Sequence, residues 1–317
     1  MTEPIRLDNT DRCQCDQGTK CPLGRIGMAE RCTKTELRAA GFQTVPADYH
    51  SDYEHVSRSM LATFAGRNGH SKYHEAYVLG KGRPFDENDN TRIGSGTHAI
   101  TLNDVKGIAN CLMIPDRALG KGGKRVGNAY KVFKLKHRDK TLLTPQQWEL
   151  CNRISKALHK RIGGLIEHPA AKREEEYRWS DAATGLRFRI KSDIEIPGSA
   201  LDDGVTLCID IKTAQSIDGF RSEVRRRKLW LQDCHYSTGL SVKYGRPVRF
   251  LFAVVEKHGN HDIEIMELED ETRSYAIQAY DGLKGSLARC YESGDWVDPG
   301  ADKVKKIALS ERDMRIE

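Results

Sequence analysis

The alternation of apolar and polar residues predicts a strand at residues 205–213. Its apolar positions are Val205, Leu207, Ile209 and Ile211, and between them lie Thr206, Cys208, Asp210 and Lys212. A period of two gives a strand two different faces, one that must be packed and one that directs Asp210 and Lys212 toward the same place. Taken alone, an acid and a lysine on one strand face are most simply a surface ion pair of small energetic value.

A second pair of strands is predicted just upstream. From Glu174, aromatic residues alternate with polar ones, and residues 181–185 are typical of a hairpin turn. The next strand is predicted to place Leu186, Phe188, Ile190, Ile194 and Ile196 on one face and Arg187, Arg189, Lys191, Asp193 and Glu195 on the other. If this strand pairs antiparallel with residues 205–213, Asp193 approaches Asp210 and Lys212.

Helical patterns surround these strands. We expect Ser57 or Ser59 to cap a helix through Phe64, and residues 94–102 to open another helix with His98 in its turn. Thr144 and Gln147 predict a capping box, and the helix that follows has an apolar stripe of Trp148, Leu150, Ile154 and Leu158.

The last third of the chain combines two helices and two strands. One long helix is predicted over residues 217–238, with Gln232 and Tyr236 four residues apart on one face. Residues 249–256 form a continuous apolar run typical of a buried central strand, and residues 262–268 alternate. A helix over residues 270–292 follows.

Composition narrows the class of protein. The chain has 317 residues, of which 38% are apolar and 30% charged, which predicts a soluble globular protein. There is no apolar run of about 18 residues and no secretory pattern at the N-terminus, so no membrane partner is expected. Nine cysteines, an odd number, favour a reducing cytoplasm over a disulfide framework.

Four of these cysteines lie within twenty residues near the N-terminus. They are Cys13, Cys15, Cys21 and Cys32. Four thiolates are the ligands of a structural Zn²⁺, although the spacing is irregular, and an iron–sulfur cluster would accept the same set. Free thiols in a loosely ordered arm are the alternative. We therefore predict a cysteine-rich arm at residues 1–40 and a larger domain at residues 41–317.

Positive charge is gathered in two stretches. The net charge of +6 permits a polyanionic partner without demanding one. Residues 119–140 contain Lys124 and Arg125 in a glycine- and lysine-rich segment, and the predicted helix at 217–238 carries Arg225, Arg226 and Lys228. Both stretches are most simply solvated surface, but both can also contact the phosphates of a nucleic acid.

The acids and the lysine together indicate a chemistry. Two carboxylates held close, here Asp193 and Asp210, need a counter-charge, which Mg²⁺ or Mn²⁺ provides through oxygen ligands. Such an ion can polarise a phosphodiester and activate water, while Lys212 offsets the charge of the transition state. Gln232 and Tyr236 are placed to bind a phosphate or to brace the lysine. A lone histidine such as His98 is more often structural.

The order Asp193, Asp210-Ile-Lys212 and Gln232-x3-Tyr236 resembles the PD-(D/E)xK nuclease superfamily. Within it, the sequence is most similar to phage-type recombination exonucleases of the RecE (exodeoxyribonuclease VIII) and lambda-exonuclease kind. The resemblance extends over roughly residues 47–300, and its further motifs are Tyr49-His50, Ser57-Arg-Ser59, Gly94-Ser-Gly-Thr-His98, Trp179-Ser-Asp181, Thr184-Gly185-Leu186, Val255-Glu256 and the late Cys290 and Trp296. Two departures are the aspartate at position 210 and Ser192, where the motif has proline.

The resemblance implies an α/β fold with a restriction-endonuclease-like core, in which helices flank a central mixed sheet behind a helical N-terminal region. It makes Asp193 and Asp210 metal ligands, Lys212 the catalytic lysine and His98 a neighbour of the metal or the scissile phosphate. A further glutamate of the site corresponds to Glu174, with Glu175 and Glu176 as alternatives.

The activity implied is degradation of linear double-stranded DNA from an end, 5′ to 3′, with Mg²⁺ or Mn²⁺, in recombination or repair. The resemblance also implies a ring-shaped homo-oligomer and a single-strand annealing partner in the cytoplasm of a bacterial or phage-infected cell. An endonuclease or single-strand nuclease of the Cas4 and RecB type is the nearest alternative, although Cas4 cysteines are split between both ends of the domain. A DNA-binding adaptor without catalysis is the rival of another class, and the filled acid and lysine positions speak against it.

Overall fold

The computed structural model describes residues 5–6, 44–45, 52–82, 87–299 and 301. The chain divides into two compact units, Met1–Val56 and Ser57–Glu317, so the boundary predicted at residue 40 falls inside the first unit. In that unit β1 (Ile5–Arg6) pairs in parallel with β2 (Thr44–Val45). The four N-terminal cysteines and the motif at Tyr49-His50 lie outside the described residues, so their predicted roles stay predictions.

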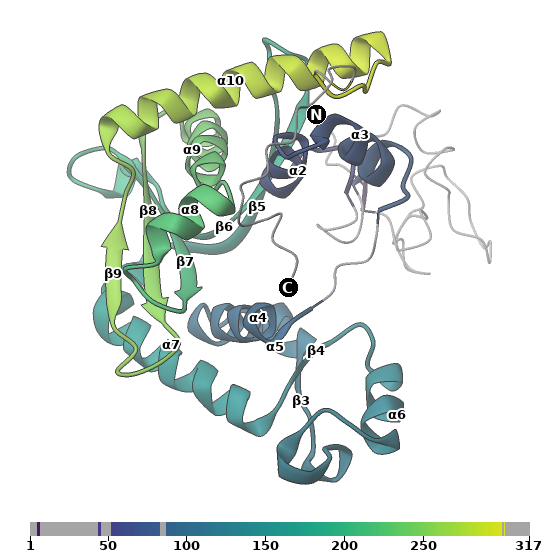
Figure 1. Ribbon diagram of the computed structural model, residues 1–317. Coiled ribbons are helices and arrows are strands. Elements are labelled where there is room, and N and C mark those ends of the chain that lie inside the picture. The colour runs from purple at the N-terminus through teal and green to yellow at the C-terminus, as the bar shows by residue number, and fades with distance from the viewer. Residues whose placement is uncertain (1–4, 7–43, 46–51, 83–86, 300, 302–317) are drawn as a thin grey trace, which may run out of the picture. The chain divides into compact units, whose positions relative to one another are not determined.

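A five-stranded mixed sheet forms the centre of the second unit (Figure 1). Its strands are β5 (Lys172–Ser180), β6 (Arg187–Ile196), β7 (Thr206–Ala214), β8 (Val248–Glu256) and β9 (Ile263–Met266), in that spatial order. Neighbours are antiparallel except β7 and β8, which run parallel and are joined through two helices. The mixed sheet flanked by helices confirms the predicted fold class.

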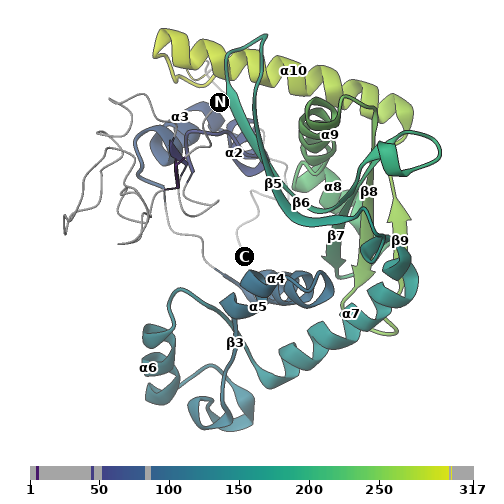
Figure 2. The same cartoon turned by 180° about the vertical axis from the view of Figure 1, so that it is seen from behind.

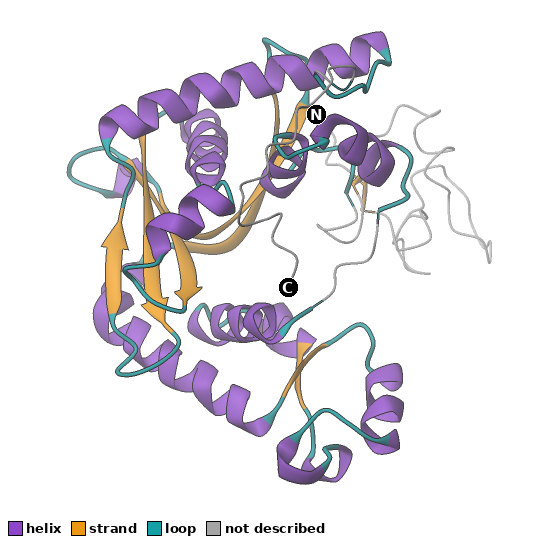
Figure 3. Ribbon diagram, in the orientation of Figure 1, coloured by secondary structure: helices purple, strands orange, loops and turns teal. Residues whose placement is uncertain are grey.

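Helices cover both faces of this sheet (Figures 1, 2 and 3). On one face lie α4 (Asp89–Thr101) and α7 (Pro145–Ile166), and on the other lies α9 (Trp230–Tyr244), with α10 (Asp270–Ser293) packed beyond it. The capping box predicted at the start of α7 is present, because Thr144 and Gln147 bond each other's backbone amides at 3.1 and 3.2 Å.

The core between α7 and the sheet comes from the predicted stripes. Ile154 and Leu158 of α7 pack with Ile194, Ile209 and Ile211 of the strands, and all five are fully or almost fully buried. Burying one such side chain contributes at most about 1.5–3 kcal/mol. The other face of β7 is also covered, since Thr206, Cys208 and Asp210 are buried on it, so the polar face predicted for this strand lies inside the protein.

The smaller elements connect these layers. They are α2 (Arg58–Phe64, capped by Ser57 as predicted), α3 (Gly69–Tyr73), the π-helix η2 (His74–Val78), α5 (Val105–Asn110), β3 (Cys111–Met113), η3 (Asp116–Ala118), η4 (Lys121–Gly123), α6 (Asn128–Lys136), β4 (Thr141–Leu143), η5 (Gly198–Ala200) and α8 (Phe220–Arg226). Five cysteines of the described part have free thiols. Within that part, no helix has the length and apolar content needed to cross a bilayer.

The single helix predicted over residues 217–238 is wrong. It is interrupted between α8 and α9, where Lys228 has a left-handed backbone with φ of 49°. The interruption lets α9 lie enclosed by the sheet and α10, with His235 and Leu240 completely buried. Ionised arginines are costly in such a place, and the break leaves the basic turn of α8 in solvent.

The helix predicted to open at Gly94 in fact begins at Asp89, behind an Asn88 cap. The glycines are therefore internal to α4 and serve close packing. A Cβ at Gly96 would lie 2.8 Å from Leu143 Cδ1 and 3.0 Å from Cys151 Sγ. His98 lies in the last turn of this helix instead of in a loop.

Candidate metal and catalytic site

The site lies where β6 and β7 separate. Their ladder pairs Ile194 with Ile209 and goes no further in the direction of Ile211. The backbone amide of Ile211 instead donates to Asp193 Oδ2 at 2.7 Å, and its carbonyl accepts from His98 Nε2 at 2.8 Å. Both peptide groups left without a strand partner are thus bound by side chains. This arrangement fixes Asp193 and His98 against the residue that lies between Asp210 and Lys212.

A break in the alternation of β6 aims Asp193 at this place. Phe188 packs against His235 of α9, with ring centroids 5.5 Å apart, whereas Ile194 belongs to the core with α7 on the opposite face. The predicted assignment of both residues to one face is therefore wrong. The pairing of β5 with β6 is interrupted at the same point, since Glu174 opposite Asp193 has φ of 55°.

The same switch moves Glu195 away from the site. Its carboxylate is completely buried on the α9 side of the sheet, where it accepts hydrogen bonds from Ser192 Oγ at 2.7 Å and Tyr244 Oη at 2.6 Å. Lys243 pairs with it as well. Glu195 was predicted to share the polar face with Asp193, and that prediction is wrong. Its three partners satisfy it within the protein.

Three side chains from three elements converge into a candidate metal site. One ligand atom each from His98, Glu174 and Asp193 lies within 4.8 Å of the others, and His98 Nδ1 is 3.3 Å from Asp193 Oδ2. Of the three consecutive glutamates, Glu174 is the one in this group, whereas Glu175 and Glu176 are exposed. Two carboxylates and one imidazole are a donor set that suits a divalent cation, so the residues present fit the metal that the fold implies.

The electrostatics of this cluster show its need for positive charge. Burial raises the pKa of Glu174, and the nearby Asp193 carboxylate raises it further. Burial disfavours protonation of His98, but Asp193 and Glu174 outweigh it and raise the pKa of His98 to about 9. Burial likewise acts against ionised Asp193, yet His98 and Lys212 hold its pKa below the usual value. Carboxylates in contact are ionised together only beside a cation.

Asp210 and Lys212 form the second half of the site. Asp210 is 2% exposed, pairs with Lys212 Nζ and accepts from Gln232 Nε2. Burial raises its pKa against the opposing effect of Lys212. The group of three that converges among the described residues is His98, Glu174 and Asp193, while Asp210 is held by the lysine and the glutamine. The predicted role of Asp210 as a metal ligand stays a prediction.

The helix residues predicted for the site have different tasks. Gln232 links Asp210 to Arg58, whose guanidinium donates to Gln232 Oε1 at 2.9 Å. Tyr236 donates to the backbone carbonyl of Lys191 at 3.1 Å and so braces β6.

Two residues of this site were not predicted from the sequence. Lys191 pairs with Glu174 beside the metal group, and Arg58 holds Gln232 from a distant part of the chain. The position of Lys191, two residues before Asp193 on one strand, was a usable signal. For Arg58 there was none beyond its membership of a motif.

The residues predicted to bind DNA are dispersed. Arg125 donates to Asp89 at 2.7 Å, to the Leu142 carbonyl at 3.0 Å and to Gln147, so it is engaged within the protein, and its predicted contact with DNA stays a prediction. Lys124 is exposed, whereas Lys228 is partly buried at the break before α9. Arg226 is exposed and lies 3.5 Å from Glu223.

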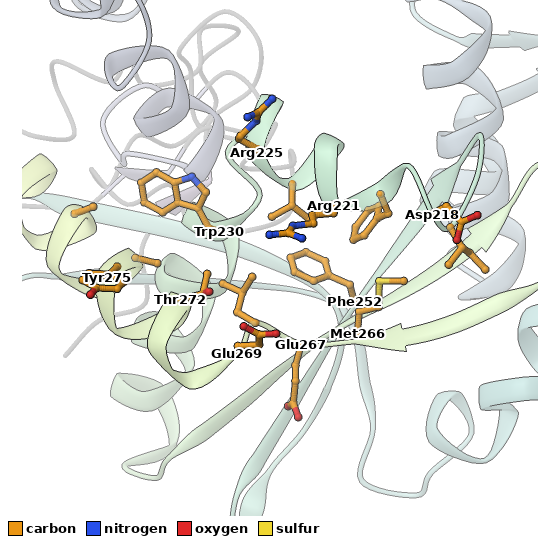
Figure 4. A pocket seen from close by; sticks show the side chains of 16 residues that line it. Asp218, Arg221, Arg225, Trp230, Phe252, Met266, Glu267, Glu269, Thr272 and Tyr275 are labelled. Atoms are coloured by element: carbon orange, nitrogen blue, oxygen red, sulfur yellow. The ribbon is translucent and has the colours of Figure 1, made fainter.

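Arg225 lines a hollow of about 660 Å³ between α8, β8, β9 and α10 (Figure 4). Its apolar wall includes Trp230, Phe252 and Met266. None of the candidate metal ligands lines this hollow, so the chemistry and the wide apolar depression belong to different parts of the molecule.

The fold and these side chains define a protein of the PD-(D/E)xK nuclease class. Residues 127–304 match the family described as a PDDEXK-like domain of unknown function (DUF3799), and the chain belongs to this family. The matched segment contains Glu174, Asp193, Asp210 and Lys212, while His98 precedes it.

One solved structure supports the assignment of the fold. A structure described as "Putative exonuclease" from Eubacterium rectale is 15% identical, covers 90% of this chain and 98% of its own, and superposes with a TM-score of 0.53. A second structure, described as SSO0001, is 14% identical and covers 61% of this chain and 87% of its own. Its TM-score of 0.27 is too low to indicate a shared fold. A search of curated proteins gives no match.

Proposed function

We propose that this protein is a metal-dependent exodeoxyribonuclease that hydrolyses linear double-stranded DNA from an end, in the 5′ to 3′ direction. The observation that carries the proposal is the double clamp on Ile211. His98 and Asp193 bind the two peptide groups of the one residue that separates Asp210 from Lys212. The metal donors and the lysine are thereby held in one rigid unit, as hydrolysis of a phosphodiester requires.

The side chains have different roles in the proposed hydrolysis. A divalent ion held by His98, Glu174 and Asp193 would polarise the phosphodiester and lower the pKa of an attacking water. Lys212 lies 14% exposed at the site and supplies positive charge toward the developing phosphorane. Gln232, itself held by Arg58, keeps Asp210 oriented toward that lysine.

Mg²⁺ and Mn²⁺ are the proposed ions. Carboxylate oxygens suit both ions. Mn²⁺ is softer than Mg²⁺ and therefore accepts the imidazole nitrogen more readily. Isothermal titration of each ion into the protein, with His98→Asn as the comparison, measures this preference. For the four N-terminal cysteines the proposal is a structural Zn²⁺, and elemental analysis of purified protein tests it.

Linear and circular duplexes distinguish the mode of cleavage. The protein is incubated with linear plasmid, closed circles and nicked circles of one sequence, in the chosen metal or in EDTA. We expect loss of the linear DNA alone, only with metal, and progressive release of label from the 5′ end. Survival of the linear DNA would remove the nuclease proposal, and equal cutting of circles would replace exonuclease by endonuclease.

Two partners complete the proposal. Exonucleases of the kind that this sequence resembles work as ring-shaped oligomers and pass their single-stranded product to an annealing protein. Light scattering coupled to size exclusion measures the oligomeric state directly. A monomer that degrades thousands of nucleotides without dissociation would contradict the ring.

A further inference from the structure

One segment of this chain carries the largest local excess of positive charge. Residues 111–143, here named the basic unit, contain nine lysines and arginines and two aspartates. Their formal charge of +7 exceeds the +6 of the whole protein, so the rest of the chain is close to neutral. The basic unit therefore holds the net excess of positive charge, although exposed cations also lie on α7 and α8.

The basic unit has a structure of its own, apart from the layers around the sheet. Its strands β3 and β4 pair in parallel, and Ile114, Ala118 and Leu142 form a small core beneath α6. Figures 1 and 2 both show it beyond α4 and α5, joined to the layers through α5 and α7. The metal group and Lys212 lie in other elements.

Cations of this unit are presented to solvent. Lys121, Lys124, Lys131 and Lys134 are all exposed, and among the described residues none of them has an acidic partner. Four exposed lysines in one small unit repel each other. Such an arrangement is stabilised when a polyanion approaches.

A hollow on the same unit is suited to an anion. It measures about 240 Å³ and lies between the end of α6 and β4, where Lys134, His137, Arg138 and Lys140 contribute to its lining. Its two acids are already engaged, since Glu87 lies 3.4 Å from Arg92 and Asp139 lies 3.8 Å from Lys140. The surplus charge of the hollow is positive.

We propose that the basic unit binds the phosphodiester backbone of a nucleic acid, with one phosphate in the hollow beside Lys134 and Arg138. The unit would hold the substrate by charge alone, away from the residues that cleave it. The choice of DNA as ligand rests on the proposed function. A membrane surface fits less well, because α6 has only nine residues and exposes only Val132 and Leu135 as large apolar side chains.

The test compares two sets of four substitutions. One variant is Lys121→Gln, Lys124→Gln, Lys131→Gln and Lys134→Gln in the basic unit. The control is Arg153→Gln, Lys156→Gln, Lys160→Gln and Arg161→Gln on the outer face of α7, which removes the same charge from equally exposed positions. Binding of a fluorescent duplex is measured by anisotropy in EDTA, across a range of salt concentrations.

We expect the first variant to bind at least about tenfold more weakly near 0.1 M salt, and its slope of log Kd against log salt to fall by about 2–4, because each lost phosphate contact removes about 0.9. The control should stay within about threefold of the wild type, since screening weakens distant charges. Circular dichroism and thermal melting confirm that both variants fold.

Three outcomes would overturn the inference: equal losses in both variants, no loss in either, or binding of the wild type to vesicles of phosphatidylcholine and phosphatidylglycerol with duplex affinity unchanged in the first variant. Hydrolysis of bis(p-nitrophenyl) phosphate with Mn²⁺ separates this proposal from the proposed function. Both variants should hydrolyse that small ester like the wild type. A wild type that binds duplex through the basic unit but never cleaves the ester would contradict only the nuclease.

Discussion

A fully buried and a partly buried carboxylate on β6 show how differently the two faces of the sheet use charge. Glu195, on the α9 face, accepts from Ser192 and Tyr244 and pairs with Lys243, so its charge is balanced by neighbours. Asp193, toward α4, lies with Glu174 and His98 in a group that could bind a metal ion. A buried acid whose partners are all within the protein indicates a structural role, whereas two acids that converge with a histidine on one place indicate metal chemistry.

The largest effect is expected at Lys212. Lys212→Ala should abolish cleavage, a loss of at least about a thousandfold, because the transition state loses its nearest fixed cation. Duplex affinity measured without metal should change by less than about threefold, since backbone contacts elsewhere carry the binding. Gel assays of linear DNA and anisotropy give the two values. Comparable cleavage by the variant would remove Lys212 from the mechanism.

Glu195→Gln tests the structural half of the comparison. It leaves the Lys243 ammonium, 15% exposed, without its acid, and the expected loss is about 2–4 kcal/mol in the free energy of unfolding. Affinity for Mn²⁺ should stay within about twofold, because the metal group is on the other side of β6. Asp193→Asn is the matched change. It should weaken Mn²⁺ binding and leave the free energy of unfolding nearly unchanged. A Glu195→Gln variant that loses metal binding would erase the distinction between the two acids.

Two adjacent glutamates sharpen the assignment of the metal group. Glu174→Gln should weaken Mn²⁺ binding by about a hundredfold, since even an outer partner of a metal ligand is worth 10–100-fold. Glu175→Gln changes the same charge one residue away on an exposed side chain and should have almost no effect. Titration calorimetry gives both affinities. An equal response would show that overall charge, and not coordination, attracts the ion.

The smallest expected effect is a loss of stability at low pH, through a buried histidine on the α9 face of the sheet. His235 is buried, donates from Nε2 to the Arg189 carbonyl and accepts from Tyr280 Oη, and burial lowers its pKa to about 3. The unfolded chain protonates this histidine below about pH 6.5, so stability present above that pH is lost as the pH falls toward 3.

At pH 5 the loss from His235 is at most about 2 kcal/mol. The expected result is a smaller difference in urea midpoint between pH 7 and pH 5 for His235→Gln than for the wild type. An unchanged difference would mean that His235 is protonated in the folded protein.

Prediction from the sequence succeeded where the signal is local. The capping box of α7, the hairpin at residues 181–185 and the strand containing Asp210 follow from patterns within a few residues, and all three are present. It failed at the helix over residues 217–238, because the burial of α9 between sheet and α10 depends on elements far along the chain. Propensity alone does not register such an enclosure.

The sequence by itself determined the strands, the alternating faces of β7 and the residue types that a phosphodiester chemistry needs. The tertiary structure alone decided which of them meet. The face switch between Ser192 and Glu195, the selection of Glu174 over its two neighbours and the approach of His98 all depend on where β5, β6 and β7 pair and where they part. Strand pairing is set by contacts between distant segments, and the position at which a ladder ends leaves no mark in the alternation of a single strand.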